Sequence, residues 1–302
     1  MQRVIIFIFA FMFVYPSHSS AQDAVYYYDG GFGVVDDAAD ATYKREVTQR
    51  IGPGVKVTRF VRGAASGKQG AEADAWVKEE QYRAKIKDGA WVIRKSAEMF
   101  LPDRVIRTFR QTGGGLYLFS DSLQGKSIIR RGTASRVMPL HLQDTVYEYY
   151  DNGRLKSLTV YDKNQMLSSE SWLKDGEKYY DNLHRYVDRE PEHTYGQVYF
   201  RAHILNAFKE AQIDVNKLNG YTEIGWVVMP DGSAVGFHGL GGSLSPVNEV
   251  IIKAIREMPG EWVPARLNNR PVRYHMVLPF NFMDVSDGFQ NVEMVGGMLF
   301  YD

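Results

Sequence analysis

A series of short segments rich in β-branched and aromatic residues, separated by turns with glycine, occupies the chain from Ala24 to Asp181. Branched and aromatic side chains fit a half-buried pleated surface, so these segments favour strands. Turns such as Lys87-Asp88-Gly89 and Asp151-Asn152-Gly153 end in glycine, which readily adopts the positive φ of a tight reversal. Strands joined by hairpins pair with their sequence neighbours, so we predict an antiparallel β-meander over residues 22–187. The expected strands are VYYYD, TYKREVTQRI, VKVTRFVR, AWVKEEQYRAKI, AWVIRK, VIRTFRQ, LYLFS, VYEYY, LKSLTVYD and SSESWL.

The pattern changes near Asp188 to alternating helices and strands. Residues 197–213 and 245–258 each repeat apolar side chains at helical spacing, and Ser245 followed by Pro246 is typical of an N-cap and first helical position. The order helix, strand, strand, helix, strand predicts an α+β domain over 188–284, with two helices on one face of an antiparallel sheet. The expected buried residues are Phe200, Ile204, Leu205, Phe208 and Ala211, then Ile224, Trp226 and Val228, then Val247, Ile251, Ile255 and Met258.

The last predicted strand carries an apolar residue at every second position, with Arg273, His275 and Asn281 on the opposite face. Trp262-Val263-Pro264-Ala265 leads into Asn268-Asn269, which tolerate turn conformations, so we predict a hairpin there. One face of the strand is expected to pack against the helices, and Arg273 and His275 are expected to point away from it. The apolar face carries Val272, Tyr274, Met276, Leu278, Phe280 and Phe282.

The N-terminus has the composition of a secretory signal peptide. A basic start, an apolar run over 4–15, Pro16 and small residues at Ser19 and Ala21 predict a signal over 1–21, cleaved after Ala21. The apolar run is short of the roughly twenty residues of a spanning helix, although an uncleaved anchor is the alternative. Residues 285–302 are assigned to a C-terminal tail.

Composition limits both the partners of the chain and the covalent cross-links that could stabilise its fold. The 36 basic and 36 acidic residues balance, so no net field draws the chain to nucleic acid. The chain has no cysteine, which excludes a disulfide framework and a lipidated N-terminal cysteine. We therefore expect a protein of the periplasm or cell envelope that is stabilised by its core alone.

Two segments resemble known families. The run with "GWVVMPDGSAV", "VNEVIIKAIREMPGEWVPA" and "NNRPVRYHMVLPFNF" resembles the C-terminal domain of TonB-type energy transducers of Bacteroidota. Tyr149 to Tyr180, with a weaker copy at Ile86 to Arg94, resembles MORN-type hairpin repeats, although a tyrosine-rich meander with Asp-Gly turns would look similar. The TonB resemblance implies binding of an extended peptide, for example from an outer-membrane receptor, at a sheet edge. A transducer also needs a membrane helix and a Pro-rich spacer, and the chain has a β-meander in the place of the spacer.

These observations favour a non-enzymatic envelope protein that binds a protein or peptide partner by β-strand addition. The alternatives are an energy transducer anchored in the inner membrane and an unrecognised hydrolase in the meander. Unpaired backbone groups of the last strand would accept the guest strand, unless the tail or a second copy in a homodimer covers the edge. The candidate binding residues are Arg270, Val272, Arg273, Tyr274, His275 and Val277.

No catalytic, cofactor or metal motif is predicted. Gly125-Lys126-Ser127 lacks the first glycine of a phosphate loop, and the glycines near residue 31 do not lead into a helix. Trp76, Trp91 and Trp172 are more typical of sheet cores than of a glycan platform. The histidines at 141, 184, 193, 203, 238 and 275 lack the spacing of metal ligands.

Overall fold

A computed structural model describes residues 24–50, 52–63, 72–95, 104–282 and 292–293. Twelve strands form one antiparallel sheet in near-sequential order, β12-β11-β10-β9-β8-β7-β6-β5-β4-β3-β1-β2, so the predicted meander is confirmed. Its strands are β1 (Ala24–Tyr28), β2 (Val34–Val35), β3 (Tyr43–Gln49), β4 (Gly54–Arg62), β5 (Trp76–Lys87), β6 (Ala90–Lys95), β7 (Val105–Gln111), β8 (Tyr117–Leu123), β9 (Ser127–Val137), β10 (Leu140–Tyr149), β11 (Leu155–Asp162) and β12 (Gln165–Ser171).

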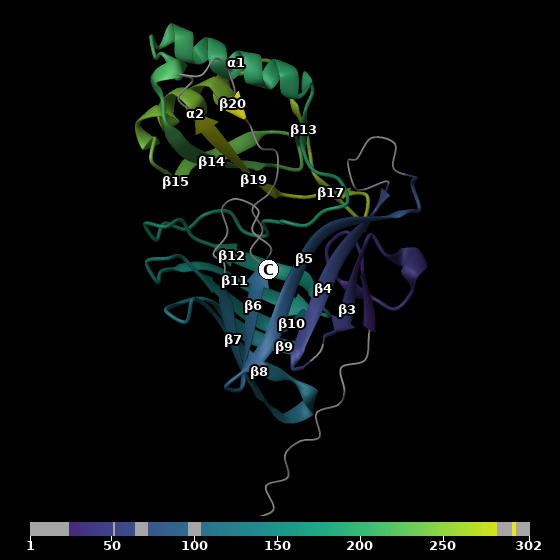
Figure 1. Cartoon of the computed structure of the whole chain (residues 1–302). Coiled ribbons are helices and arrows are strands. Elements are labelled where there is room, and N and C mark those ends of the chain that lie inside the picture. The colour runs from purple at the N-terminus through teal and green to yellow at the C-terminus, as the bar shows by residue number, and fades with distance from the viewer. Residues whose placement is uncertain (1–23, 51, 64–71, 96–103, 283–291, 294–302) are drawn as a thin grey trace, which may run out of the picture.

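The sheet curls until its two ends meet (Figure 1). The Val34 amide donates to the Lys163 carbonyl at 2.7 Å, across the gap between β2 and the β11–β12 turn. The Asn164 side-chain amide donates to the Phe32 carbonyl at 2.8 Å, and its Oδ1 accepts from the Leu142 amide at 2.7 Å. These bonds hold the first and last hairpins together, so one face of the meander becomes an interior.

That interior holds charged as well as apolar side chains. Apolar residues such as Val57 and Phe119 fill part of it. Beside them the fully buried Asp121 accepts two hydrogen bonds from Arg107, at 2.7 and 2.9 Å, and one from Arg130 at 2.9 Å. The inward arginine interrupts the apolar alternation of β9, and this explains why the sequence did not predict β9. The first half of β10 was not predicted either.

The second unit has the predicted α+β order. Helices α1 (Gly196–Glu210) and α2 (Asn248–Glu257) lie on one face of a sheet ordered β15-β14-β19-β20, on the side away from the meander (Figure 1). The strands are β14 (Gly220–Val228), β15 (Ala234–Gly242), β19 (Tyr274–Phe282) and β20 (Val292–Glu293), with the short strands β13 (Glu192–His193), β16 (Trp262–Val263), β17 (Arg266–Leu267) and β18 (Arg270–Pro271) at one end. Trp226 is fully buried at the centre of the core, between the sheet and both helices.

Three details of the predicted helices and strand are wrong. Ser245 is not the N-cap of α2: it starts a 3-10 turn, Ser245–Val247, and its hydroxyl points back to the Gly242 carbonyl at 3.5 Å. Helix α1 ends at Glu210, so Ala211 is exposed, while Leu205 is only half-buried. Tyr274 is buried, but it packs with Val187 and Ala265 and not against the helices.

The predicted turns form, but the last hairpin pairs fewer residues than expected. Asp88 and Gly89 have positive φ, 53° and 75°, as a two-residue hairpin turn requires. Asn268 and Asn269, at 50° and 60°, join only β17 to β18, whereas Trp262 pairs with β13. The predicted signal over 1–21 lies outside the described residues, as does most of the tail 285–302. Within the described part of the chain, no helix is long and apolar enough to cross a membrane.

The two units contact one another through the chain segment that joins them. The Tyr179 hydroxyl donates to the Gly236 carbonyl at 2.5 Å, and the Arg273 guanidinium donates to the Asp181 carbonyl at 3.0 Å. The Val187 side chain is buried against Tyr274. The face of the C-terminal sheet that the helices leave uncovered is therefore turned toward the meander.

Candidate functional site

The outer edge of β19 is the site that the sequence predicted. The Tyr221 carbonyl of β14 accepts from the Leu244 amide, on the side of β14 away from β19. Peptide groups of successive strand residues point to opposite sides, so the even-numbered residues of β14 direct their N–H and C=O groups toward β19. Arg273 accepts from the His184 amide at 3.0 Å on the outer side of β19. Odd-numbered residues of β19 therefore direct their peptide groups outward. Among the described residues, only a bridge at His184 and the two-residue strand β20 pair with this edge.

The stretch from Met276 to Pro279 lies between these two contacts. Val277 directs its N–H and C=O outward by the same alternation, and no strand of the described chain pairs with it. Pro279 occupies an outward-facing position, where its missing N–H costs no hydrogen bond to β14. Proline in a sheet is confined to such edges. The proline is thus an independent indication that this side of β19 is an edge.

The candidate binding residues do not share one environment. Arg270 is exposed in β18, and Val272 is half-buried beside Tyr274. Arg273 is engaged with the Asp181 carbonyl, and His275 packs edge-on against Tyr179, with the ring centres 5.7 Å apart. Both side chains do point away from the helices, as predicted. Their partners lie in the segment that joins the two units, which leaves the backbone edge as the part of the site open to a guest strand.

His275 belongs to a pair of stacked histidines that the sequence did not reveal. Its ring lies 5.7 Å from that of His238 in β15, with 15° between the planes. Gly225 of β14 passes between them, and a Cβ there would lie 2.8 Å from His238 Cε1 and 3.0 Å from His275 Nε2. Only glycine leaves room for both rings.

Both histidines of the pair are neutral. Burial lowers the pKa of His275 to about 3, assisted by the neighbouring His238 and Arg185, and burial likewise lowers the pKa of His238. His238 Nδ1 lies 2.9 Å from the Gly236 carbonyl, so Nδ1 carries the proton and Nε2 carries a lone pair. Neither Nε2 atom has a hydrogen-bond partner in the described part of the chain, although both are buried.

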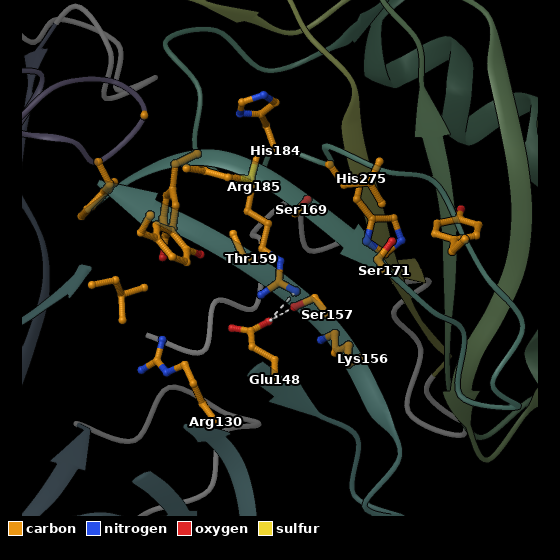
Figure 2. Close-up of a pocket in the computed structure, with 18 of the residues that line it drawn as sticks. Arg130, Glu148, Lys156, Ser157, Thr159, Ser169, Ser171, His184, Arg185 and His275 are labelled. Carbon is orange, nitrogen blue, oxygen red and sulfur yellow. Dashed lines mark hydrogen bonds and ion pairs between the residues drawn. The ribbon is translucent and has the colours of Figure 1, made fainter. Parts of the chain in front are cut away.

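These histidines form one side of a cavity of about 130 Å³ between the curled sheet and the C-terminal sheet. The opposite side carries ionisable and hydroxyl side chains from β9 to β12, which Figure 2 shows converging on one space. Apolar side chains complete the lining. Besides His238 and His275, the polar side chains are Arg45, Arg130, Glu148, Tyr150, Lys156, Ser157, Thr159, Tyr161, Asn164, Ser169, Ser171, Tyr179, His184, Arg185 and Tyr186, and the apolar ones include Phe32, Leu140, Leu142, Met166, Trp172, Leu173 and Leu183.

Two of the residues that line the cavity, Glu148 and Arg185, form an ion pair with each other, whereas Lys156 has no carboxylate partner at ion-pair distance among the described residues. Glu148 accepts from Arg185 at 2.9 Å; burial by itself would raise the pKa of Glu148, but Arg185 and Lys156 outweigh it and lower the pKa to about 2. Lys156 makes no ion pair with a described residue, and its Nζ lies 5.7 Å from the centre of the Tyr150 ring. Burial and Arg185 lower the pKa of Lys156 to about 8, against the opposing effects of Glu148 and Glu223.

Chemically, the cavity offers positive charge, hydroxyls and lone pairs, without a metal site. No group of three or more histidine or carboxylate side chains with the proximity of metal ligands occurs among the described residues. Searches against protein-family models, curated proteins and solved structures found no match to this chain. The resemblances to TonB-type domains and MORN repeats therefore stay hypotheses.

The sequence pointed to the edge but not to the cavity. Residues 130, 156, 185, 238 and 275 come from four strands and a connecting segment, and no local spacing links them. The only available signal was the pair of adjacent arginines within residues 127–137, where charge interrupts an otherwise strand-like composition.

Proposed function

We propose that this chain is an exported protein of the periplasm or cell envelope that binds a protein or peptide partner by adding the partner's strand to the outer edge of β19. Binding of this kind uses the unpaired N–H and C=O groups of an edge strand. The observation that supports the proposal is the stretch Met276–Pro279, with which no described strand pairs on its outer side. The proposal includes no catalytic activity.

Backbone hydrogen bonds would provide most of the affinity at this edge. Val277 offers an outward N–H and C=O, whereas Pro279 offers only a C=O. The guest strand would therefore be short, and β20 and the His184 bridge would limit it at its two ends. An extended segment of an outer-membrane receptor or of another envelope protein fits this description.

The test is the Val277→Pro variant of the full chain, used as bait on envelope extract of the source organism. Proline removes the outward N–H without breaking a bond to β14, so the variant should stay folded and lose capture of the partner at least tenfold. Val277→Thr is the matched control: it keeps the N–H and a branched side chain, and it should capture the partner as the wild type does.

Leu278→Pro tests the register on which this reasoning depends. Its N–H faces Ile224 in β14, so this substitution should destabilise the sheet while Val277→Pro does not. A protein captured equally by the wild type, Val277→Pro and Val277→Thr would show that this edge is not the binding surface.

A further inference from the structure

The cavity between the two units shares His275 with β19 but has its own chemical character. Its charged groups do not balance. Among the described residues, four cationic side chains line it, Arg45, Arg130, Lys156 and Arg185, and one carboxylate, Glu148. Just outside the lining, Asp121 bonds Arg107 and Arg130, Asp29 accepts from the Gly31 amide, and Glu223 acts on Lys156.

The three ion pairs at the cavity wall leave a residual positive charge. Asp121 is shared by Arg107 and Arg130, so that cluster keeps one unit of positive charge. Glu148 neutralises Arg185 at 2.9 Å. Lys156 is left without an ion pair among the described residues, in a site where burial opposes its charge. Lys156 is half-buried, and Glu148 and Glu223 act on it only from beyond ion-pair distance. A cation shielded from water without a close anionic partner is costly, which points to an anion that enters from outside.

The rest of the lining suits the oxygens of such an anion. Hydroxyls of Ser157, Thr159 and Ser169 line the cavity on adjacent strands (Figure 2). The Ser157 hydroxyl already donates to Glu148 at 3.2 Å, which leaves Thr159 and Ser169 to face an anion. Across the cavity, the unpartnered Nε2 of His275 can donate to an anion in the tautomer in which it carries the proton, whereas the Nε2 lone pair of His238 cannot. Buried polar atoms without a protein partner normally contact water or a ligand.

The size of the cavity limits the ligand. Its volume of about 130 Å³ has room for several water molecules, and this suits an anion with a few non-hydrogen atoms. Drug-sized ligands occupy about 300–1,000 Å³. We propose that this cavity binds a small oxyanion, a carboxylate or a phosphate, with Lys156 as the principal charged contact and Arg130, Arg185 and the serine and threonine hydroxyls around it.

Calorimetric titration of the full chain with inorganic phosphate, acetate and succinate tests the proposal, with chloride at matched ionic strength as the reference. We expect saturable binding of phosphate or of a carboxylate, and the probe that binds tells the two chemistries apart. Lys156→Met should weaken that binding at least tenfold, and Lys156→Arg should retain it within a few-fold. Lys209→Met is the matched control, because Lys209 is exposed on α1 and does not line the cavity.

The pH dependence gives a second readout. Glu148, Arg185, Glu223, Tyr150 and His275 are the charged and titratable groups that face Lys156. Affinity should fall as the pH rises through about 8, where Lys156 loses its proton, and this fall should be absent in Lys156→Arg.

Two results would overturn the proposal. One is the absence of saturable binding of every oxyanion to the wild-type chain, which needs no variant to be informative. The other is equal binding by Lys156→Met and Lys209→Met, since the charge at residue 156 would then contribute nothing.

Discussion

The buried carboxylate of Asp121 allows a quantitative test of how the curled sheet is held together. Its side chain has no exposed surface and accepts three hydrogen bonds from Arg107 and Arg130 at 2.7–2.9 Å. Asp121→Asn keeps the shape but removes the charge, so two buried guanidiniums lose their counterion. Breaking a buried ion pair by removing one partner costs about 3–5 kcal/mol, and we expect a loss of this size in the free energy of unfolding.

Asp151→Asn is the matched control for this substitution. Asp151 lies 2.7 Å from Lys174, but both side chains are largely exposed, 73% and 50%. Exposed pairs contribute about 0–1 kcal/mol, so the control should unfold nearly as the wild type does. Urea denaturation followed by circular dichroism measures both variants, with the midpoint and slope fitted separately.

The same ion-pair cluster also predicts in which direction the free energy of unfolding changes with pH. Burial by itself would raise the pKa of Asp121, but the charges and hydrogen bonds of Arg107 and Arg130 outweigh it and hold the pKa below its usual 3.8. A carboxyl whose pKa is depressed on folding stabilises the protein above its unfolded pKa, and this contribution is lost as the pH falls through the folded pKa. Below about pH 4 the wild type should therefore lose stability more steeply than Asp121→Asn. Equal losses for Asp121→Asn and Asp151→Asn at neutral pH would refute the reasoning.

Two further predictions concern the histidine pair and the N-terminus. Gly225→Ala places a Cβ within 3.0 Å of both rings and should cost about 1–3 kcal/mol in urea unfolding, whereas Gly113→Ala, with no atom within 4 Å of its Cβ, should cost less than about 0.5 kcal/mol. Equal effects would show that the rings move aside freely. N-terminal sequencing of the chain from envelope fractions should start at Gln22; full-length chain from Met1 in the inner-membrane pellet would support the anchored transducer instead.

Much of the fold followed from local patterns in the sequence. Hairpin turns such as Asp88-Gly89 and the helical stripe of Ile251 and Ile255 depend on neighbours a few residues away, and the structure has them as predicted. Met258 is buried as predicted, but it lies just past the end of α2. The prediction of strands failed where charged side chains, and not apolar ones, face the interior. Arg130 faces the interior of the curled sheet because Asp121, nine residues earlier, supplies its counterion, so β9 lacks the usual apolar alternation.

The candidate site also has a part that the sequence predicted, the strand β19, and a part that it did not, the cavity. The alternation from Val272 to Phe282 was enough to predict a half-buried strand, and Pro279 within it is consistent with an edge. No pattern placed His275 beside His238, because the two lie on different strands and meet only over Gly225. The same holds for Lys156 and Arg185, which reach the cavity from β11 and from the connecting segment.

The sequence by itself determined the local order of this chain: which segments become strands or helices, where most turns fall, and which face of each element is apolar. Those properties depend on residue shape and on periodicity over a few positions. Only the tertiary structure decided that the meander curls on itself and that its polar interior faces the uncovered side of the C-terminal sheet. One cavity brings together Lys156, Arg185 and His275 because of the register and curvature of strands that are far apart in the chain. No short stretch of the sequence contains the information that sets this register and curvature.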